Sequence, residues 1–368
     1  MAFRRRVKNL ANVLLDWGWD SSKKRPVTVF NPTRYVARLA PGEEPVYTRF
    51  HYSEDTFSEG ELVPDEACSI KTDGGVLWIN IDGLRKDEVE RICATYNIHQ
   101  LVVEDILSTG QSAKMDEIGS VIYCLLPMIY YNAATGHLEA EQVSIVLGED
   151  FVLSFQEDKM RDVFDPVRSR LRMEGSKLRN SDAGYLCYSL IDVIVDSYFG
   201  VLEQMNDRIE KLEDNILLQK ERAATEKVSI LRREVMFLRR LIAPVKDLVA
   251  GFLRSESPLI EDRQDKYFKD ILDHISQAND YVDAHRDILM NLQDVFNSQI
   301  NLRLNEVMKI FTLVAVLLAP ATVIGGIFGM NFDVIPMAHQ EAGFWWAVSA
   351  MLLIPLLMLI WFKRKGWF

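Results

Sequence analysis

Side chains that end in an amide or a hydroxyl group recur along an otherwise apolar segment near the C-terminus: Asn305, Thr312, Thr322 and Asn331. The intervals of 7 and 17 residues after Asn305 place both threonines on roughly its face of a helix. Met308 and Phe311 add bulky apolar groups to this face. Rings of oxygen atoms can hold a hydrated ion, and apolar constrictions can close a path by excluding water. The spacing therefore fits an ion path with an apolar gate.

The glycines at the end of this segment allow a simpler interpretation. Gly325 and Gly329 have the G-x-x-x-G spacing of helix packing in membranes. Gly329 or Asn331 could also end the helix in a left-handed conformation. Membrane threonines often bond back to their own helix. Taken alone, these residues favour packing and capping over an ion path.

Two apolar runs must position the polar residues. Residues 310–328 and 344–362 are each 19 residues long and carry no charge. A hydrocarbon core about 30 Å thick needs roughly 20 such residues of helix, so each run predicts a transmembrane helix. Aromatic residues of the kind found at membrane interfaces flank the second run: Trp345, Trp346, Trp361 and Trp367. A buried hairpin in a soluble protein is the alternative. Two helices cannot enclose a pore, so any pore needs several copies.

Charges predict the orientation of these two spans. Arg303 and Lys309 precede the first span, and a Lys-Arg-Lys run at 363–365 follows the second. The connecting loop, 329–343, has neither lysine nor arginine but carries Asp333 and Glu341. By the positive-inside rule both termini lie in the cytoplasm and the loop lies outside.

The rest of the chain reads as a cytoplasmic body. Residues 76–82 and 121–131 are β-branched and aromatic runs, and 141–155 predicts a hairpin that turns at 148–150. Long helical patterns follow, and one that begins near Asp262 could continue into the first span as a helix of about 65 residues, on the order of 100 Å long. Its narrow apolar stripe predicts an oligomer with a central bundle.

Composition excludes several function classes. The net charge of −11 argues against a nucleic-acid surface and makes cations plausible partners. The four cysteines are scattered, which predicts neither a disulfide framework nor a zinc site. The basic N-terminus has no long apolar run behind it, so a cleaved signal peptide is not expected. The sequence has no P-loop, G-x-S-x-G or H-E-x-x-H motif, so we expect neither an enzyme nor ATP-driven transport.

About four-fifths of the chain resembles the CorA family of magnesium channels, with the signature Gly-Met-Asn at 329–331 near the C-terminus. The matching stretches are "RLNEVMKIFTLVAVLLAPATVIGGIFGMNF", "FKRKGWF", "EQVSIVLGEDFVLSFQED", "VFDPVRSRLR", "YLCYSLIDVIVDSYF" and "FKDILDHISQANDYVDAHRDI". The resemblance implies a funnel-shaped homopentamer in the cell inner membrane, with an α/β cytoplasmic domain and a pore lined by the first span. It implies influx of Mg²⁺ driven by the membrane potential, with Co²⁺ and Ni²⁺ as further ions.

On this basis the chain divides into an α/β domain, long cytoplasmic helices, a first span, an outer loop, a second span and a basic tail: 1–180, 181–309, 310–328, 329–343, 344–362 and 363–368. The resemblance assigns the outer pore entrance to Gly329, Met330 and Asn331. It assigns polar pore positions to Asn305 and Thr322, the apolar gate to Met308 and Phe311, and a basic ring to Lys363, Arg364 and Lys365. Ala319 should form no constriction.

The resemblance also implies regulatory metal sites between neighbouring subunits. Asp105 and Asp270 form the first expected pair. Glu104, Asp192 and His274 are expected to complete a second site nearby. Cytoplasmic Mg²⁺ would bridge these groups and hold the channel closed, and without it the facing carboxylates would repel one another.

Two features leave alternatives open. The family usually has a glutamate in the outer loop where this chain has Met337, which puts loop-assisted cation capture and ion preference in question. A zinc transporter of the ZntB-like branch shares the architecture, although that branch tends to vary the Gly-Met-Asn signature that is intact here. A non-conducting, membrane-anchored cation sensor is the third interpretation.

Overall fold

The computed structural model describes residues 44–67, 74–108, 110–132, 135–158, 162–217, 224–331, 335–337, 340 and 342–366. Asp333, Glu341 and Trp367, which entered the sequence argument, lie outside these ranges. The chain forms two compact units, Met1–Val201 with Leu241–Ala278, and Leu202–Arg240 with Asn279–Phe368. This division cuts across the long helices, so each unit is described by itself.

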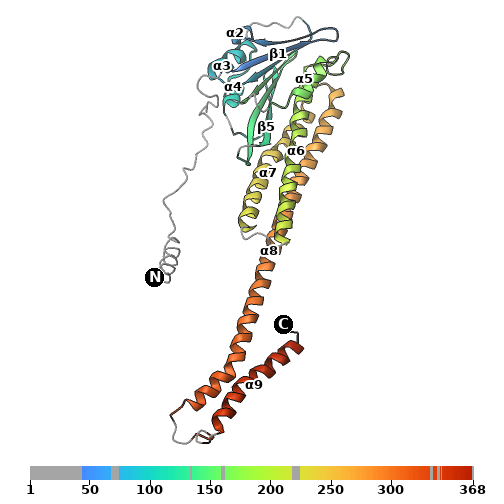
Figure 1. The fold of residues 1–368 in the computed structure, drawn as a ribbon. Coiled ribbons are helices and arrows are strands. Elements are labelled where there is room, and N and C mark those ends of the chain that lie inside the picture. The colour runs from blue at the N-terminus through green and yellow to red at the C-terminus, as the bar shows by residue number, and fades with distance from the viewer. Residues whose placement is uncertain are drawn as a thin grey trace. The chain divides into compact units, whose positions relative to one another are not determined.

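A seven-stranded sheet forms the centre of the first unit (Figure 1). Its strands are β1 (Val46–Tyr52), β2 (Phe57–Leu62), β3 (Val76–Asp82), β4 (Lys114–Ile118), β5 (Val121–Tyr131), β6 (Leu138–Leu147) and β7 (Phe151–Gln156). Their order is β2-β1-β3-β7-β6-β5-β4, and only β3 and β7 pair in parallel. The predicted hairpin is confirmed, because β6 and β7 are antiparallel and Gly148 N donates to Phe151 O across the turn at 2.8 Å.

Short helices cover the sheet and complete its core. They are α2 (Pro64–Ala67), α3 (Lys86–Thr95), α4 (Gln100–Leu107) and α5 (Asp165–Arg172). In α4, Val102, Val103 and Ile106 are buried in the core cluster. The helical period therefore turns Glu104 outward and leaves Asp105 half-buried at the edge.

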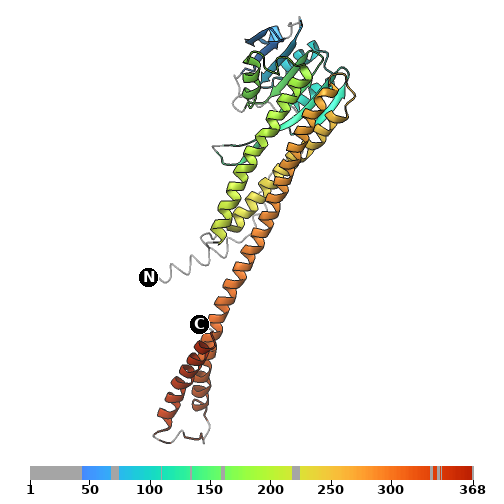
Figure 2. The ribbon, with the colours of Figure 1, turned by 90° about the vertical axis from the view of Figure 1, so that its right-hand side faces the viewer.

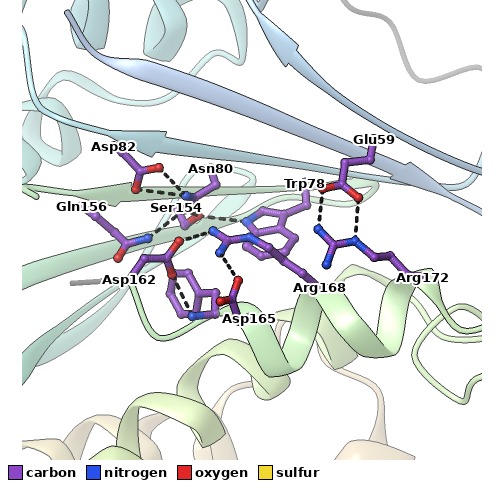
Figure 3. A network of polar contacts seen from close by, with 11 residues as sticks. Glu59, Trp78, Asn80, Asp82, Ser154, Gln156, Asp162, Asp165, Arg168 and Arg172 are labelled. Atoms are coloured by element: carbon purple, nitrogen blue, oxygen red, sulfur yellow. Dashed lines mark hydrogen bonds and ion pairs between the residues drawn. The ribbon is translucent and has the colours of Figure 1, made fainter. Parts of the chain in front are cut away.

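A buried polar network fixes the parallel pair β3–β7 (Figure 3). Asn80 Oδ1 accepts hydrogen bonds from Ser154 Oγ at 2.6 Å and from Gln156 Nε2 at 3.1 Å. Its Nδ2 donates to both carboxylate oxygens of Asp82 at 3.1 Å. The guanidinium of Arg168 lies 5.7 Å from the centre of the Trp78 ring. Hydrogen bonds in a dry environment make the register of the two strands specific.

Four long helices follow: α6 (Ala183–Leu217), α7 (Ala224–Arg254), α8 (Asp265–Phe328) and α9 (Gly343–Arg364). A 3₁₀ turn, η2 (Asp262–Gln264), precedes α8. The continuous helix predicted from the sequence is confirmed, because α8 runs for 64 residues without a break. Its length is about 96 Å at 1.5 Å per residue.

Burial separates the helices that could cross a membrane from one that only resembles them. Within the part of the chain that the structure describes, three helices, α6, α8 and α9, are long and apolar enough. The apolar window of α6 is 67% buried inside the protein, whereas those of α8 and α9 are each 6% buried. Thus α6 is a core helix, and α8 and α9 expose apolar surface. Within the second unit, α8 and α9 approach closely, since a methyl group added to Gly325 would lie 3.5 Å from Met351 Cε (Figure 2).

Candidate functional site

A cluster of cation-binding groups lies in the first unit. Asp192 and Asp196 of α6 and His274 of α8 each offer a ligand atom, and these atoms lie within 4.8 Å of one another. The i, i+4 spacing places both carboxylates on one face of α6. His274 Nδ1 is 3.3 Å from Asp196 Oδ1. The ring of His274 meets the ring of Phe199 edge-on, with 6.2 Å between the ring centres.

The environment of this cluster disfavours the ionised form of Asp192. Asp192 is only 9% exposed, whereas Asp196 is exposed. Burial raises the pKa of Asp192 to about 6, and the charge of Asp196 acts in the same direction. A cation in this cluster would relieve both effects, because it favours ionised carboxylates.

Tyr188 connects the cluster to the predicted ligand Asp270. Tyr188 precedes Asp192 by one turn of α6 and is buried. Burial raises the pKa of its phenol, and the nearby charges of Asp192 and Asp270 add to the increase. Asp270 is exposed and lies one turn before His274 on α8. The structure thus brings three of the predicted ligands, Asp192, Asp270 and His274, to one region.

Asp105 is engaged elsewhere in the same unit. Lys114 Nζ donates to Asp105 Oδ2 at 2.6 Å, and Gln111 Nε2 donates to Oδ1 at 3.0 Å. Among the residues that the structure describes, Asp105 forms no bond with Asp270. Glu104, its neighbour, is exposed. Among the described residues, the cluster of possible metal ligands includes neither Asp105 nor Glu104.

The predicted pore residues lie along α8 in the second unit. Asn305 is exposed, and Met308 and Phe311 are 62% and 68% exposed. Thr322 Oγ1 donates to Leu318 O at 3.1 Å, as expected for a threonine that bonds back to its own helix. Such a hydroxyl has given away its hydrogen but keeps its oxygen lone pairs for a cation or water.

The turn after α8 is tight. Gly329 N donates to Gly325 O at 2.9 Å, and Met330 N donates to Ile327 O at 3.3 Å. A Cβ at Gly329 would lie 3.0 Å from Gly325 O. The left-handed cap suggested for Gly329 is wrong, because its φ is not positive. Glycine is needed here for the close approach of backbone to backbone. Met330 is half exposed and Asn331 is exposed.

Known proteins match this arrangement over most of the chain. The family model of the CorA-like Mg²⁺ transporter protein matches residues 73–364. The chain belongs to the CorA family. It is 38% identical over 319 residues to the cobalt/magnesium transport protein CorA of Thermotoga maritima, a match that covers 86% of this chain and 91% of that protein. CorA proteins are transporters and channels, so the chain is not an enzyme.

Solved structures show the same fold. The complete CorA magnesium transporter of Methanocaldococcus jannaschii superimposes with a TM-score of 0.75 at 20% identity, covering 88% of this chain and 99% of that one. The cytoplasmic domain of ZntB from Vibrio parahaemolyticus gives a TM-score of 0.56 at 12% identity, covering 69% and 98%. The CorA fold therefore confirms the α/β domain, the long helices and the apolar C-terminal helix predicted from the sequence.

Sequence reasoning missed one member of this cluster of metal-binding groups. Asp196 follows Asp192 at i, i+4 and shares its helical face, and this spacing could have found it. The partner of Asp105 was missed as well. Lys114 lies on β4, and its position in the fold follows only from the pairing of β4 with β5.

Proposed function

We propose that this chain is one subunit of a homopentameric magnesium channel in the cell inner membrane, with both termini in the cytoplasm. The membrane potential drives Mg²⁺ inward, and intracellular Mg²⁺ closes the channel. Co²⁺ and Ni²⁺ are further ions that it passes. The observation that carries this proposal is the exposed line of pore residues on α8, which ends directly in the Gly329-Met330-Asn331 signature.

An exposed apolar stripe on α8 supports the assembly. Tyr281, Ile288, Val295 and Leu302 recur every seven residues and are 45%, 37%, 39% and 63% exposed. A second stripe, with Val282 and Leu289, is buried inside the unit. Heptad spacing is the pattern by which helices pack against other helices, so the exposed stripe fits a central bundle of α8 copies.

The polar residues on α8 have the chemistry for a hydrated cation. Mg²⁺ gives up its water reluctantly and requires octahedral geometry. An amide from Asn331 of each copy would hold the outer water shell, and Asn305 and Thr322 would repeat such rings along the path. Met308 and Phe311 would close the path by dewetting. Two charges gain roughly 4.6 kcal/mol per 100 mV, which suffices for uptake without ATP. Lys363, Arg364 and Lys365 would ring the cytoplasmic end.

Regulation is assigned to the carboxylates of the first unit. Asp270 of one copy would share a metal ion with Asp105 of the next, and Asp192, His274 and Glu104 would complete a second site. Asp196 joins this second site on the geometry of the cluster. Loss of the ion leaves like charges that repel, so the bundle loosens and the path fills with water.

Transport of Zn²⁺ is the second candidate function. His274 in the cluster favours it, because Zn²⁺ prefers nitrogen ligands to oxygen more than Mg²⁺ does. Residues 310–328, however, contain neither histidine nor cysteine. A path lined by amide and hydroxyl oxygens fits Mg²⁺ better. A cation sensor that conducts nothing would need no polar line on α8.

The test is ion flux into liposomes that contain the purified protein. Mg²⁺ uptake is measured with and without Mg²⁺ on the cytoplasmic side, for the wild type, Asn331→Ala and the control Ser349→Ala, which alters an exposed polar residue of α9. We expect uptake that internal Mg²⁺ stops, that Asn331→Ala abolishes and that Ser349→Ala leaves unchanged. Zn²⁺ flux without Mg²⁺ flux would support the second candidate, and no flux from folded pentamers would support the sensor.

A further inference from the structure

The carboxylate of Asp105 already has a cationic partner in its own chain. Both of its oxygens are engaged, Oδ2 by Lys114 and Oδ1 by Gln111. The side chains of Lys114 and Asp105 are 32% and 21% exposed, so the ion pair is partly shielded from water. An ammonium group at 2.6 Å occupies the position from which a metal ion would approach this oxygen.

The backbone holds the two residues in place. Asp105 lies in the last turn of α4, and its carbonyl oxygen accepts a hydrogen bond from Gln142 Nε2 of β6 at 3.0 Å. Lys114 is the first residue of β4 and pairs with Leu125 of β5. Helix and sheet therefore present the ammonium to the carboxylate, and the contact costs less side-chain entropy than a pair between two mobile surface residues.

Lys114 has a second acidic partner close by. Its Nζ lies 3.4 Å from Asp116 Oδ2 on the same strand and 5.8 Å from the centre of the Tyr123 ring. Burial lowers the pKa of Lys114, but its bonds to Asp105 and Asp116 outweigh this effect and leave the pKa raised. The group is therefore charged at any physiological pH. A lysine is a point charge on a flexible stem, so it can exchange one carboxylate for the other.

We propose that Lys114 is a built-in competitor that sets the Mg²⁺ concentration at which Asp105 binds its ion. This inference rests on the proposed function of Asp105 as a regulatory ligand. While cytoplasmic Mg²⁺ is low, the ammonium group of Lys114 stays paired with Asp105. When Mg²⁺ rises, the ion displaces Lys114, which turns to Asp116. Because the ion pair must break, its free energy reduces the binding free energy of Mg²⁺. The Mg²⁺ concentration at which Asp105 binds its ion is therefore higher.

The test measures metal binding to the full-length protein without relying on transport. The melting temperature is recorded against Mg²⁺ concentration, and the concentration of half-maximal stabilisation is compared between variants. We expect Lys114→Met and Lys114→Gln to lower it by about 1.5- to 5-fold, the range for a partly exposed ion pair. Lys114→Arg keeps a competing cation and should not lower it. The control Lys86→Met removes a lysine paired with Glu90 on the surface and should change nothing.

Asp105→Asn tests the role of Asp105 as a regulatory ligand separately from the role of Lys114 as its competitor. If it raises the half-maximal concentration, Asp105 is a ligand, and in the double variant with Lys114→Met the lysine should have no further effect. An unchanged or higher value in both Lys114→Met and Lys114→Gln would then overturn the competitor while leaving the regulatory site intact. If Asp105→Asn itself changes nothing, the regulatory role of Asp105 fails and the competitor fails with it. The two neutral replacements differ in shape, so a folding defect in one leaves the other as the test.

Discussion

The indole Nε1 of Trp78 donates a hydrogen bond to Ser154 Oγ at 2.9 Å, although 76 residues separate the two in the chain. The hydroxyl of Ser154 in turn donates a hydrogen bond to Asn80 Oδ1, so the three side chains form a continuous chain of hydrogen bonds. All three groups are fully buried. One hydroxyl group therefore joins the two strands of the only parallel pair in the described sheet.

Replacing this hydroxyl should destabilise the first unit. Ser154→Ala leaves the indole N–H of Trp78 without its acceptor in a dry environment, which costs about 1–3 kcal/mol. We expect a clear loss of free energy of unfolding in chemical denaturation followed by circular dichroism. Ser58→Ala alters an exposed serine of β2 and should be neutral. Equal effects of the two substitutions would mean that the network contributes nothing specific.

Asp192→Asn should have opposite effects with and without metal. The fold disfavours the ionised carboxylate of Asp192, because it is buried beside Asp196. In a chelator the neutral amide should stabilise the protein by about 1 kcal/mol, or roughly 2–4 °C in melting temperature. With Mg²⁺ or Co²⁺ the variant should lose most of the stabilisation that the wild type gains. A variant that is less stable in chelator but still responds fully to metal would contradict the proposed ligand.

The pH dependence of stability provides an independent check on Asp192. Its pKa is about 6 in the folded chain, against an ordinary value of 3.8. The folded state therefore binds the proton more tightly than the unfolded state does. The contribution of this group to stability is fully present below about pH 4 and is lost as the pH rises through 6. In chelator, the stability difference between Asp192→Asn and wild type should grow over this range. A difference that does not change with pH would show that Asp192 titrates normally.

Gly329→Ala should impair the turn that follows α8. The added methyl group would lie 3.0 Å from Gly325 O, so the backbone has to move. Overpacking of this kind typically costs about 1–3 kcal/mol. We expect reduced Mg²⁺ flux in liposomes, because the turn positions Asn331. Gly326→Ala is the matched control, since a methyl group there meets nothing within 4 Å. Normal Mg²⁺ flux in Gly329→Ala would show that the close approach of Gly329 to Gly325 O is not needed to position Asn331.

A charge on the exposed stripe of α8 should disrupt the assembly. Ile288→Glu places five carboxylates in the proposed central bundle, where they lose apolar contact and repel one another. We expect light scattering after size-exclusion chromatography to show particles smaller than a pentamer. Asn297→Glu adds the same charge at an exposed position nine residues after Ile288, on the opposite side of α8 from the stripe, and should leave the particle unchanged. Intact pentamers from Ile288→Glu would show that other contacts hold the copies together.

Local patterns were enough for elements whose contacts are close in the chain. The hairpin of β6 and β7 follows from alternating apolar residues around Gly148, and α8 follows from a helical pattern without proline before Pro320. The parallel pairing of β3 with β7 depends on contacts across more than 70 residues, for which the sequence carries no local signal. The charge state of Asp192 depends on burial, which hydropathy alone does not reveal. The Asp105–Lys114 pair likewise depends on how α4 meets β4.

The exposed stripe of α8 also constrains how a cell makes this protein. Residues 281–302 leave the ribosome before residues 310–328. The exposed apolar stripe of α8 is therefore made before the apolar run that would anchor it in a membrane. In the proposed assembly, this surface stays open to chaperones and to non-specific aggregation until other copies of the chain cover it. We therefore expect orphan subunits to be short-lived, and synthesis of several chains on neighbouring ribosomes to favour productive biogenesis.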